Sequence, residues 1–328
     1  MPCKKARSSS SPWPSLPADI ADEGERPFRL PRAAGHHGSS GAWLLFRRRD
    51  GGYSLLDPFS MAAMPPLPTL LSSSSAAACD ALNKPFVREE YDMIGLGRRD
   101  RLEVGAAEPD PRTLTVRRLV VCSAGHVAAV VGVEGQRLGK FAVCRPGAAS
   151  WSVCGQDQWR RIKDMVMYQG DLYAVDHNED LLAVTVDDAS SPAVTRIRRA
   201  VKGAAPSFDP RRRLTLHYLV DAGAGELLMR WAEVSTLGDD GVALFLGKWG
   251  SRAVRAPEEH RKEWADHIFF LDDGASDGFW SPPLYALSTY DMRPQMTYRL
   301  LPVTSRHGAD LFPATWIFPQ QGTRVDAR

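Results

Sequence analysis

From Trp43 onward, the chain is a succession of short apolar runs separated by polar turns. The runs carry valine, leucine, phenylalanine and tyrosine, and their starts mostly lie about ten residues apart. This spacing is typical of β-strands in sandwiches, barrels and propellers. The predicted strands are 43–46, 53–56, 115–122, 127–133, 138–144, 165–168, 172–175, 181–186, 214–220, 226–231, 243–246 and 267–271.

The clearest hairpin is predicted between residues 171–176 and 181–186, which flank the polar turn His177-Asn-Glu-Asp180. Helical periodicity is nearly absent, and only residues 257–264, with Pro257 at the first turn, are predicted to form a short helix. The strand-rich region, residues 43–319, is long enough to favour a propeller over a sandwich or a barrel. No strict WD or kelch repeat is visible, so any blades are degenerate. The predicted fold class is mostly β: a degenerate β-propeller, complete or incomplete.

Three segments are predicted to lie outside this region or to loop out of it. Residues 1–42 are rich in proline and glycine and include the loop-like run 35–41, which predicts a disordered N-terminal segment. The run Ser72-Ser-Ser-Ser-Ala-Ala-Ala78 predicts a flexible surface insertion at about 71–81. Residues 320–328 are interpreted as a tail.

Composition narrows the class of protein without identifying its function. The chain has 328 residues, of which 44% are hydrophobic and 24% charged, which excludes a wholly disordered chain, a collagen and a coiled coil. The formal net charge is only +2, which argues against nucleic acid as the main partner. The basic clusters are expected to flank strands or to occupy turns; they are 47–49, 98–101, 198–199 and 211–213.

The cysteines are expected to be reduced thiols, mostly in core positions, because none forms a C-x-x-C pair. This predicts a cytoplasmic or nuclear protein. No apolar run approaches the roughly 20 residues that span a bilayer, so no membrane partner is expected. The first 18 residues faintly resemble an organellar transit peptide, although a disordered leader is the preferred interpretation. The five cysteines are Cys3, Cys79, Cys122, Cys144 and Cys154.

One motif suggests catalysis. Residues 274–278, Gly-Ala-Ser-Asp-Gly, match the G-x-S-x-G turn that exposes the nucleophile of many hydrolases, with Asp291 and His307 following in the right chain order. The residues after it, Phe279-Trp-Ser-Pro-Pro283, cannot begin the helix that such a turn requires. A glycine-rich turn is therefore the preferred interpretation, and a serine hydrolase using Ser276 is the alternative.

No metal or cofactor site is predicted. Asp176, Asn178 and Asp180 imitate the start of a calcium loop, but the sixth position is Leu181 where the loop needs glycine, so a hairpin turn explains them better. The pairs His36-His37 and His260/His267 have no further ligand at suitable spacing.

Several segments carry recognisable motifs in a fixed order: GAWLL at 41–45 with LLDPFS at 55–60, WRRIKDMVMYQGDLYA at 159–174, HYLVD at 217–221 with GELL at 225–228, LGDDGVALFLG at 237–247, HIFFLDD at 267–273 and WIFP at 316–319. In this order they resemble the plant F-box proteins that carry a KIB-type β-propeller, a domain long catalogued as of unknown function. The resemblance implies a non-enzymatic protein-interaction module, the substrate-recognition part of a ubiquitin-ligase adaptor.

In that family an N-terminal F-box docks on the Skp adaptor of a cullin complex, and here the resemblance breaks down. Residues 12–20 resemble the start of an F-box, but only 22 residues separate Ile20 from Trp43, too few and too rich in glycine and proline for a helical bundle. The F-box is thus expected to be largely deleted, and Skp docking weakened or lost. Any surviving contact is expected to use Trp13, Leu16, Pro17 and Ile20.

A second departure lies between Leu228 and Leu237, where the family has at least one more strand. A missing strand leaves a blade with an unpaired edge, which promotes aggregation unless it is covered. A third interpretation is therefore a truncated family member that folds poorly.

Overall fold

The computed structural model describes residues 35–70, 88–91, 98–101, 114–122, 125–133, 138–154, 159–187, 191–203, 217–221, 227–229, 236–237, 241–271, 287–301 and 315–318. The chain divides into two units, Met1–Arg32 and Ala33–Arg328, and all described residues belong to the second. The predicted insertion at 71–81, the tail and the F-box remnant lie outside the described residues, as do Ser276 and His307.

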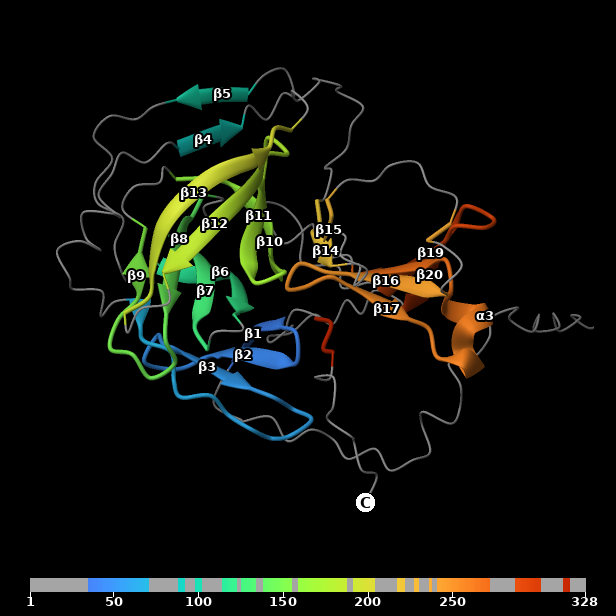
Figure 1. The fold of residues 1–328 in the computed structure, drawn as a ribbon, viewed down its shortest axis with the longest axis horizontal. Coiled ribbons are helices and arrows are strands. Elements are labelled where there is room, and N and C mark those ends of the chain that lie inside the picture. Colours follow the sequence, from blue (N-terminus) through green and yellow to red (C-terminus); the bar gives the residue numbers. More distant parts are fainter. Residues whose placement is uncertain are drawn as a thin grey trace, which may run out of the picture. The chain divides into compact units, whose positions relative to one another are not determined.

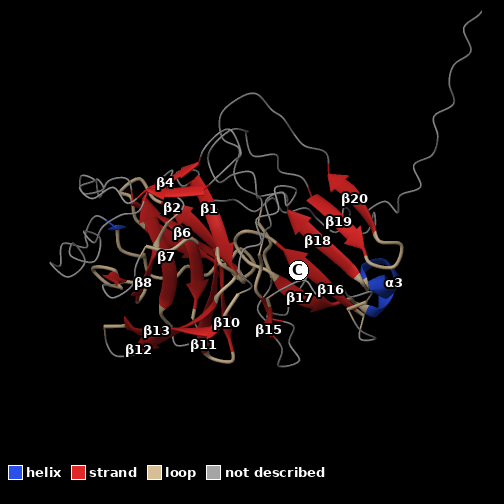
Figure 2. Ribbon diagram, turned by 90° about the horizontal axis from the view of Figure 1, so that it is seen from above, coloured by secondary structure: helices blue, strands red, loops and turns tan. Residues whose placement is uncertain are grey.

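The described structure is mostly β, with strands in more than half of its residues and very little helix, as the sequence predicts (Figures 1 and 2). The first sheet is antiparallel and contains β1 (Gly35–Ser40), β2 (Trp43–Arg47) and β3 (Tyr53–Leu56). A separate hairpin pairs β4 (Arg88–Tyr91) with β5 (Arg98–Arg101).

Two four-stranded sheets have the organisation of propeller blades, because each is an antiparallel meander in chain order. One contains β6 (Leu114–Val121), β7 (Val127–Val133), β8 (Lys140–Cys144) and β9 (Ser152–Val153). The other contains β10 (Ile162–Tyr168), β11 (Asp171–Asp176), β12 (Leu181–Asp187) and β13 (Ala193–Val201).

The remaining strands merge into one seven-stranded sheet in the order β15-β14-β17-β16-β18-β19-β20. It includes two parallel pairs, β14 with β17 and β16 with β18, which a single antiparallel blade lacks. Its elements are β14 (Val220–Asp221), β15 (Leu227–Leu228), β16 (Val242–Leu246), β17 (Arg252–Arg255), β18 (His267–Leu271), β19 (Leu287–Asp291) and β20 (Met296–Leu301), with the 3₁₀ turn η3 (Glu258–His260) and helix α3 (Arg261–Trp264) between β17 and β18.

The side chains of β7 alternate between the two faces of its sheet, and this alternation explains how that sheet packs against its two neighbours. Val127, Ala129 and Val131 pack into the hydrophobic cluster that includes Leu45 and Tyr53 of the first sheet. The alternate residues of β7 pack into the second cluster, together with residues of β10, β11 and β12. Because successive side chains of a strand point to opposite faces, the sheet of β6 to β9 is buried on both sides at β7.

Three of the predicted core cysteines are confirmed. Cys122, Cys144 and Cys154 are buried free thiols. Burial raises the pKa of Cys122 to about 11, because the thiolate would lose its solvation. The pKa of Cys144 is also raised by burial. Cys3 and Cys79 lie outside the described residues.

The predicted start of the strand-rich region at residue 43 is wrong, because the first sheet begins with β1 at Gly35. The glycines and serines of Gly35–Gly41 predict a loop. In the structure, the backbone of this run pairs antiparallel with β2, and the register shifts between His36 and Gly38. Pairing with an apolar neighbour strand thus outweighs a weak local strand propensity.

The placement of two basic clusters is also corrected. Arg198 and Arg199 lie inside β13, and residues 98–101 form β5, where the sequence predicts turns or strand flanks. In β13 most side chains are exposed, so its sequence lacks the apolar alternation that reveals a strand.

The strands predicted at 214–220 and 226–231 lie only partly within the described residues, where 217–219 and Met229 are not strand. Within the described residues, β14 and β15 have two residues each. They pair antiparallel, and β15 is the last strand at that edge of the sheet among the described residues. This part of the sheet coincides with the segment where the sequence indicates a missing strand.

The segment 315–318 joins the first sheet to the last. The N–H of Phe318 donates to the carbonyl of Gly41, which follows β1, at 3.2 Å. The indole Nε1 of Trp316 donates to the carbonyl of Leu246, at the end of β16, at 2.7 Å. No helix in the described part of the chain is long and apolar enough to cross a membrane.

Candidate interaction surface

A cluster of aromatic side chains covers one face of the seven-stranded sheet. Phe245 of β16 lies opposite Phe269 of β18 in parallel register, and their rings stack with centroids 4.9 Å apart. The residues on either side of Phe245, Leu244 and Leu246, are buried and pack with Ile268 in the core cluster on the opposite face. Strand alternation thus gives this sheet two apolar faces, of which the aromatic one is only half-buried.

Three further rings from other elements meet Phe245 edge to face. Trp264 comes from α3, at 6.1 Å between centroids, and Trp316 and Phe318 come from 315–318, at 5.0 and 5.9 Å. Edge-to-face contacts at such distances are favourable beyond the area that they bury. We call Phe245, Trp264, Phe269, Trp316 and Phe318 the Phe245 cluster.

Charged and polar groups flank the Phe245 cluster. The guanidinium of Arg252 on β17 lies 5.6 Å from the ring centroid of Phe318, a cation–π geometry. His260 stacks on Trp264 at 5.5 Å, and its Nδ1 lies 3.4 Å from a carboxylate oxygen of Glu263. Half-buried tryptophan and arginine side chains are the types most enriched at energetically important points of protein interfaces. Chemically, this surface is suited to binding another protein.

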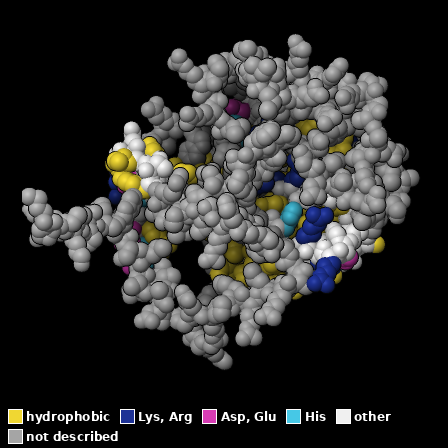
Figure 3. Space-filling model, turned by 180° about the vertical axis from the view of Figure 1, so that it is seen from behind, with side chains coloured by type: hydrophobic (Ala, Val, Ile, Leu, Met, Phe, Trp, Pro, Cys, Tyr) yellow, Lys and Arg dark blue, Asp and Glu magenta, His cyan; other side chains and the backbone are white. Residues whose placement is uncertain are grey.

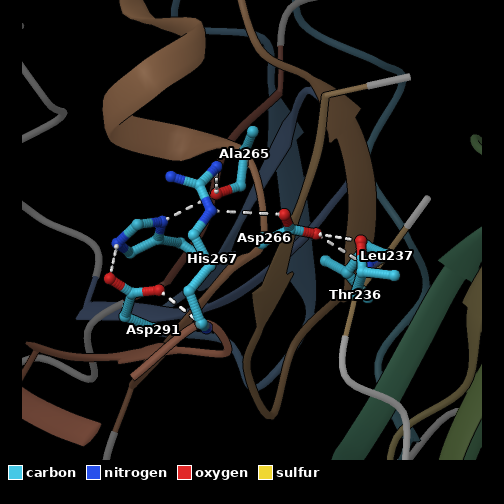
Figure 4. Close-up of polar contacts among 7 residues, drawn as sticks. Thr236, Leu237, Ala265, Asp266, His267 and Asp291 are labelled. Carbon is cyan, nitrogen blue, oxygen red and sulfur yellow. Dashed lines mark hydrogen bonds and ion pairs between the residues drawn. The ribbon is translucent and has the colours of Figure 1, made fainter. Parts of the chain in front are cut away.

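Next to the Phe245 cluster, Asp266 holds the start of β18 in place (Figure 4). Its Oδ1 accepts hydrogen bonds from the hydroxyl of Thr236 at 2.7 Å and from the N–H of Leu237 at 2.8 Å. Its Oδ2 accepts from Nε of Arg293 at 3.4 Å, and Arg293 also donates through Nη2 to the carbonyl of Ala265 at 3.2 Å. One carboxylate therefore connects three separate segments of the chain.

The environment of Asp266 stabilises its charged form. Burial alone would raise the pKa of this carboxyl, but the hydrogen bonds from Leu237, Thr236 and Arg293 outweigh it, so the pKa is lowered. Asp266 has φ +61°, a left-handed conformation that aspartate tolerates better than most residues. Both features indicate a structural role at the turn before β18.

Asp291, the acid of the alternative hydrolase, belongs to the same network. Its Oδ2 lies 3.4 Å from Nε2 of His267, whose Nδ1 is 3.0 Å from the carbonyl of Ala265 (Figure 4). Its Oδ1 accepts from the N–H of Arg293 at 3.0 Å. Ser276 and His307 lie outside the described residues, so the hydrolase hypothesis stays an untested prediction.

The calcium-like run at Asp176 forms the predicted hairpin turn. Oδ1 of Asp176 accepts from the N–H of Asn178 at 2.8 Å and from the N–H of Asp180 at 3.1 Å. The side chain of Asp180 accepts from Nη1 of Arg199 and from the N–H of Gly203. These oxygens serve the turn itself, and the prediction of a hairpin between 171–176 and 181–186 is confirmed.

In the described part of the chain, His260 and His267 contact different side chains. His260 faces Trp264 and Glu263, whereas His267 faces Asp291. No group of three or more histidine, cysteine, aspartate or glutamate side chains with metal-binding geometry occurs among the described residues.

A comparison with protein-family models identifies the family of this chain. The KIB1-4 beta-propeller model matches residues 18–230, more than half of the sequence. The chain belongs to this β-propeller family. Domains of the KIB type generally act as non-enzymatic interaction modules. A comparison with curated proteins gave no match.

The limits of the family match bear on the predicted domain boundaries. The match begins at residue 18, within the segment 1–42 that the sequence analysis places before the propeller. It ends at residue 230, so the Phe245 cluster lies beyond the matched region. The four residues predicted to contact Skp are Trp13, Leu16, Pro17 and Ile20, and they lie outside the described residues.

The Phe245 cluster is not predicted as a unit by the sequence. Its members come from β16, β18, α3 and 315–318, and only the tertiary structure brings them together. One local signal was present: both WIFP at 316–319 and the strand 243–246 place aromatic residues beside aliphatic ones. On the face shown in Figure 3, basic and histidine side chains also lie close to hydrophobic ones.

Proposed function

We propose that this chain is a non-enzymatic protein-recognition module, related to the substrate-binding part of F-box ubiquitin-ligase adaptors, in which docking to a Skp adaptor is weakened or lost. The observation that carries the proposal is the match to the KIB1-4 beta-propeller family. Its partners are then substrate proteins and, at most weakly, a Skp adaptor. The protein acts in the cytoplasm or the nucleus, without a cofactor.

The Phe245 cluster supports a role in binding proteins. Two tryptophans and an arginine, Trp264, Trp316 and Arg252, lie half-buried at one sheet face. Rigid aromatic side chains contribute contact area at low cost in conformational entropy. A surface of this kind favours recognition of a partner over chemistry on a small substrate.

Weakened Skp docking is supported by the N-terminal sequence. An F-box needs amphipathic helices that pack on one another, and residues 21–42 contain six prolines and glycines: Gly24, Pro27, Pro31, Gly35, Gly38 and Gly41. Two of these, Gly35 and Gly38, are part of β1, so that stretch is committed to the first sheet.

Co-purification with a plant Skp adaptor tests the ligase-adaptor part of the proposal. A family relative with a full F-box serves as the positive control, and circular dichroism establishes that the purified chain is folded. We expect the relative to retain Skp and this chain to retain little or none. Retention as strong as the relative's would contradict weakened docking. If retention is weak but measurable, Trp13→Ala and Leu16→Ala should abolish it.

The non-enzymatic part is tested separately. Labelling by a fluorophosphonate probe that disappears in Ser276→Ala would contradict it and would favour the hydrolase. The Skp experiment is unaffected by that result, so the two parts of the proposal are judged independently.

A further inference from the structure

Strand β13 is the outermost strand of its four-stranded sheet (Figure 1). It has nine residues, and its only strand partner among the described residues is β12. Exposed edge strands present backbone N–H and C=O groups to which another chain can add. From Arg196 to Val201, all side chains except Ile197 are exposed, so the outer part of this edge is accessible.

The pairing with β12 defines which side chains share a face of the sheet. Arg196 lies opposite Thr185, Arg198 opposite Ala183 and Val201 opposite Leu181. Residues directly opposite one another lie on the same side, and so do alternate residues of β12. Arg196, Arg198 and Val201 therefore form a row along one side of the edge, and Val201 is 47% exposed.

The two arginines of this row, Arg196 and Arg198, are exposed and carry positive charge. Arg199 pairs with Asp180 at 3.1 Å, on the opposite side of the strand. Arg196, Arg198 and Lys202 have no ion pair with any described residue. An approaching acidic side chain would therefore gain a favourable interaction that this surface does not already provide.

The same charges disfavour a second copy of this chain as the occupant. Two β13 edges placed together would bring arginines opposite arginines, and positive charge on an edge is a common protection against self-association. Register irregularities fall between Arg199 and Val201 and between Val194 and Arg196, which leaves Arg196–Arg199 as the regular stretch. A partner with acidic side chains is attracted by these arginines instead of repelled, and its backbone can pair with Arg196–Arg199.

We propose that the free edge of β13 binds an acidic, extended segment of a partner protein as an added β-strand. The segment would place acidic residues at alternate positions, opposite Arg196 and Arg198, and an apolar residue near Val201. This proposal assigns a recognition surface to the proposed function and rests on it.

A direct binding titration tests the proposal with the purified full chain. The probe is a fluorescein-labelled peptide, Val-Thr-Glu-Thr-Glu-Thr-Val, whose symmetric pattern fits either strand direction. Binding is followed by fluorescence anisotropy at low salt. We expect Arg196→Glu combined with Arg198→Glu to weaken binding by at least about tenfold, because two attractive pairs become repulsive. Hydrogen exchange of β13 amides should slow when the peptide is bound.

Two controls separate strand addition from a general effect of charge. Arg49→Glu combined with Lys262→Glu makes the same change in net charge at exposed positions on other elements, and it should leave binding within about twofold of the unmodified chain. A peptide methylated on alternate backbone nitrogens keeps its charge but cannot donate along one edge. The methyl groups can be placed on the odd-numbered or on the even-numbered nitrogens, and only one of these two sets faces β13 in an added strand. The peptide methylated on that set should bind at least about tenfold more weakly, because strand addition needs those donors.

Several results would overturn the proposal. They are no binding by the unmodified chain, equal binding by the Arg196→Glu/Arg198→Glu variant, or equal binding of both methylated peptides. Tighter binding of a short single-stranded DNA that displaces the peptide would also overturn it, and would assign the edge to nucleic acid. The β13 variant should match the unmodified chain in the Skp experiment, so failure here is distinguishable from failure of the ligase-adaptor role.

Discussion

At Gly38, strand β1 passes directly against the indole of Trp249. A β-carbon at this position would overlap the six-membered ring of Trp249, so only glycine fits. We expect Gly38→Ala to lower the free energy of unfolding by about 1–3 kcal/mol, the usual cost of overpacking a core. Urea denaturation measures the loss. In a Trp249→Ala background the same substitution should cost clearly less, and an unchanged cost would show that the ring contact is not the cause.

The carboxyl of Asp266 makes stability depend on pH. Its pKa in the folded chain lies below the ordinary value of 3.8, because the hydrogen bonds from Leu237, Thr236 and Arg293 outweigh burial. The carboxylate therefore stabilises the fold above pH 3.8, and this contribution is lost as the pH falls through the folded-state pKa.

Asp266→Asn tests this dependence. Asparagine keeps an acceptor oxygen and tolerates the left-handed backbone, but it does not titrate. We expect the variant to lose less stability than the unmodified chain between pH 5 and pH 2.5, roughly the range in which such a carboxylate is protonated. Chemical denaturation at several pH values measures the difference. Parallel curves for the two proteins would mean that Asp266 does not contribute.

Among the elements, those with a strong local signal were predictable from sequence. The hairpin of β11 and β12 was predicted to within one residue, because a polar turn separates two apolar runs. The helix at α3 was predicted from Pro257 and the polar run that follows it. By contrast, β13 and β17 were missed, because both are rich in arginine and rely on pairing with a neighbour.

The turn of this hairpin depends on Asp176, whose side chain is buried and accepts from two backbone N–H groups. Asp176→Ala leaves these donors without their acceptor, and we expect it to cost about 1–3 kcal/mol of stability. Asp171→Ala, at the exposed start of the same strand, serves as the matched control and should cost less than about 0.5 kcal/mol. Thermal unfolding of both variants provides the comparison, and similar losses would contradict this role of Asp176.

For the whole molecule, sequence predicted the class of fold but not how the last strands combine. Local patterns give strands and turns, whereas the parallel pairing of β16 with β18 joins residues across the η3–α3 segment. The Phe245 cluster depends on this pairing, because it stacks Phe245 on Phe269. The same long-range dependence explains why the cluster could not be predicted from its separate segments.

The segment 315–318 contacts both the first sheet and the seven-stranded sheet, and this link predicts how the structure unfolds. Trp316 contributes the ring contact with Phe245 and a hydrogen bond to the carbonyl of Leu246. The backbone of Phe318 bonds to the residue that follows β1. If these contacts couple the first and last sheets, breaking them should let the seven-stranded sheet open separately from the rest.

Trp316→Ala tests this coupling, with Trp316→Phe as the control that keeps an aromatic ring but loses the N–H. We expect Trp316→Ala to cost about 1–3 kcal/mol, less than truncation of a fully buried tryptophan, because Trp316 is half-buried. Hydrogen exchange should then be faster in β16 and β18 while β6 and β7 stay protected. Trp316→Phe should fall between, because one hydrogen bond is worth about 1 kcal/mol. Equal acceleration in all four strands would mean that the domain unfolds as one unit, with or without this link.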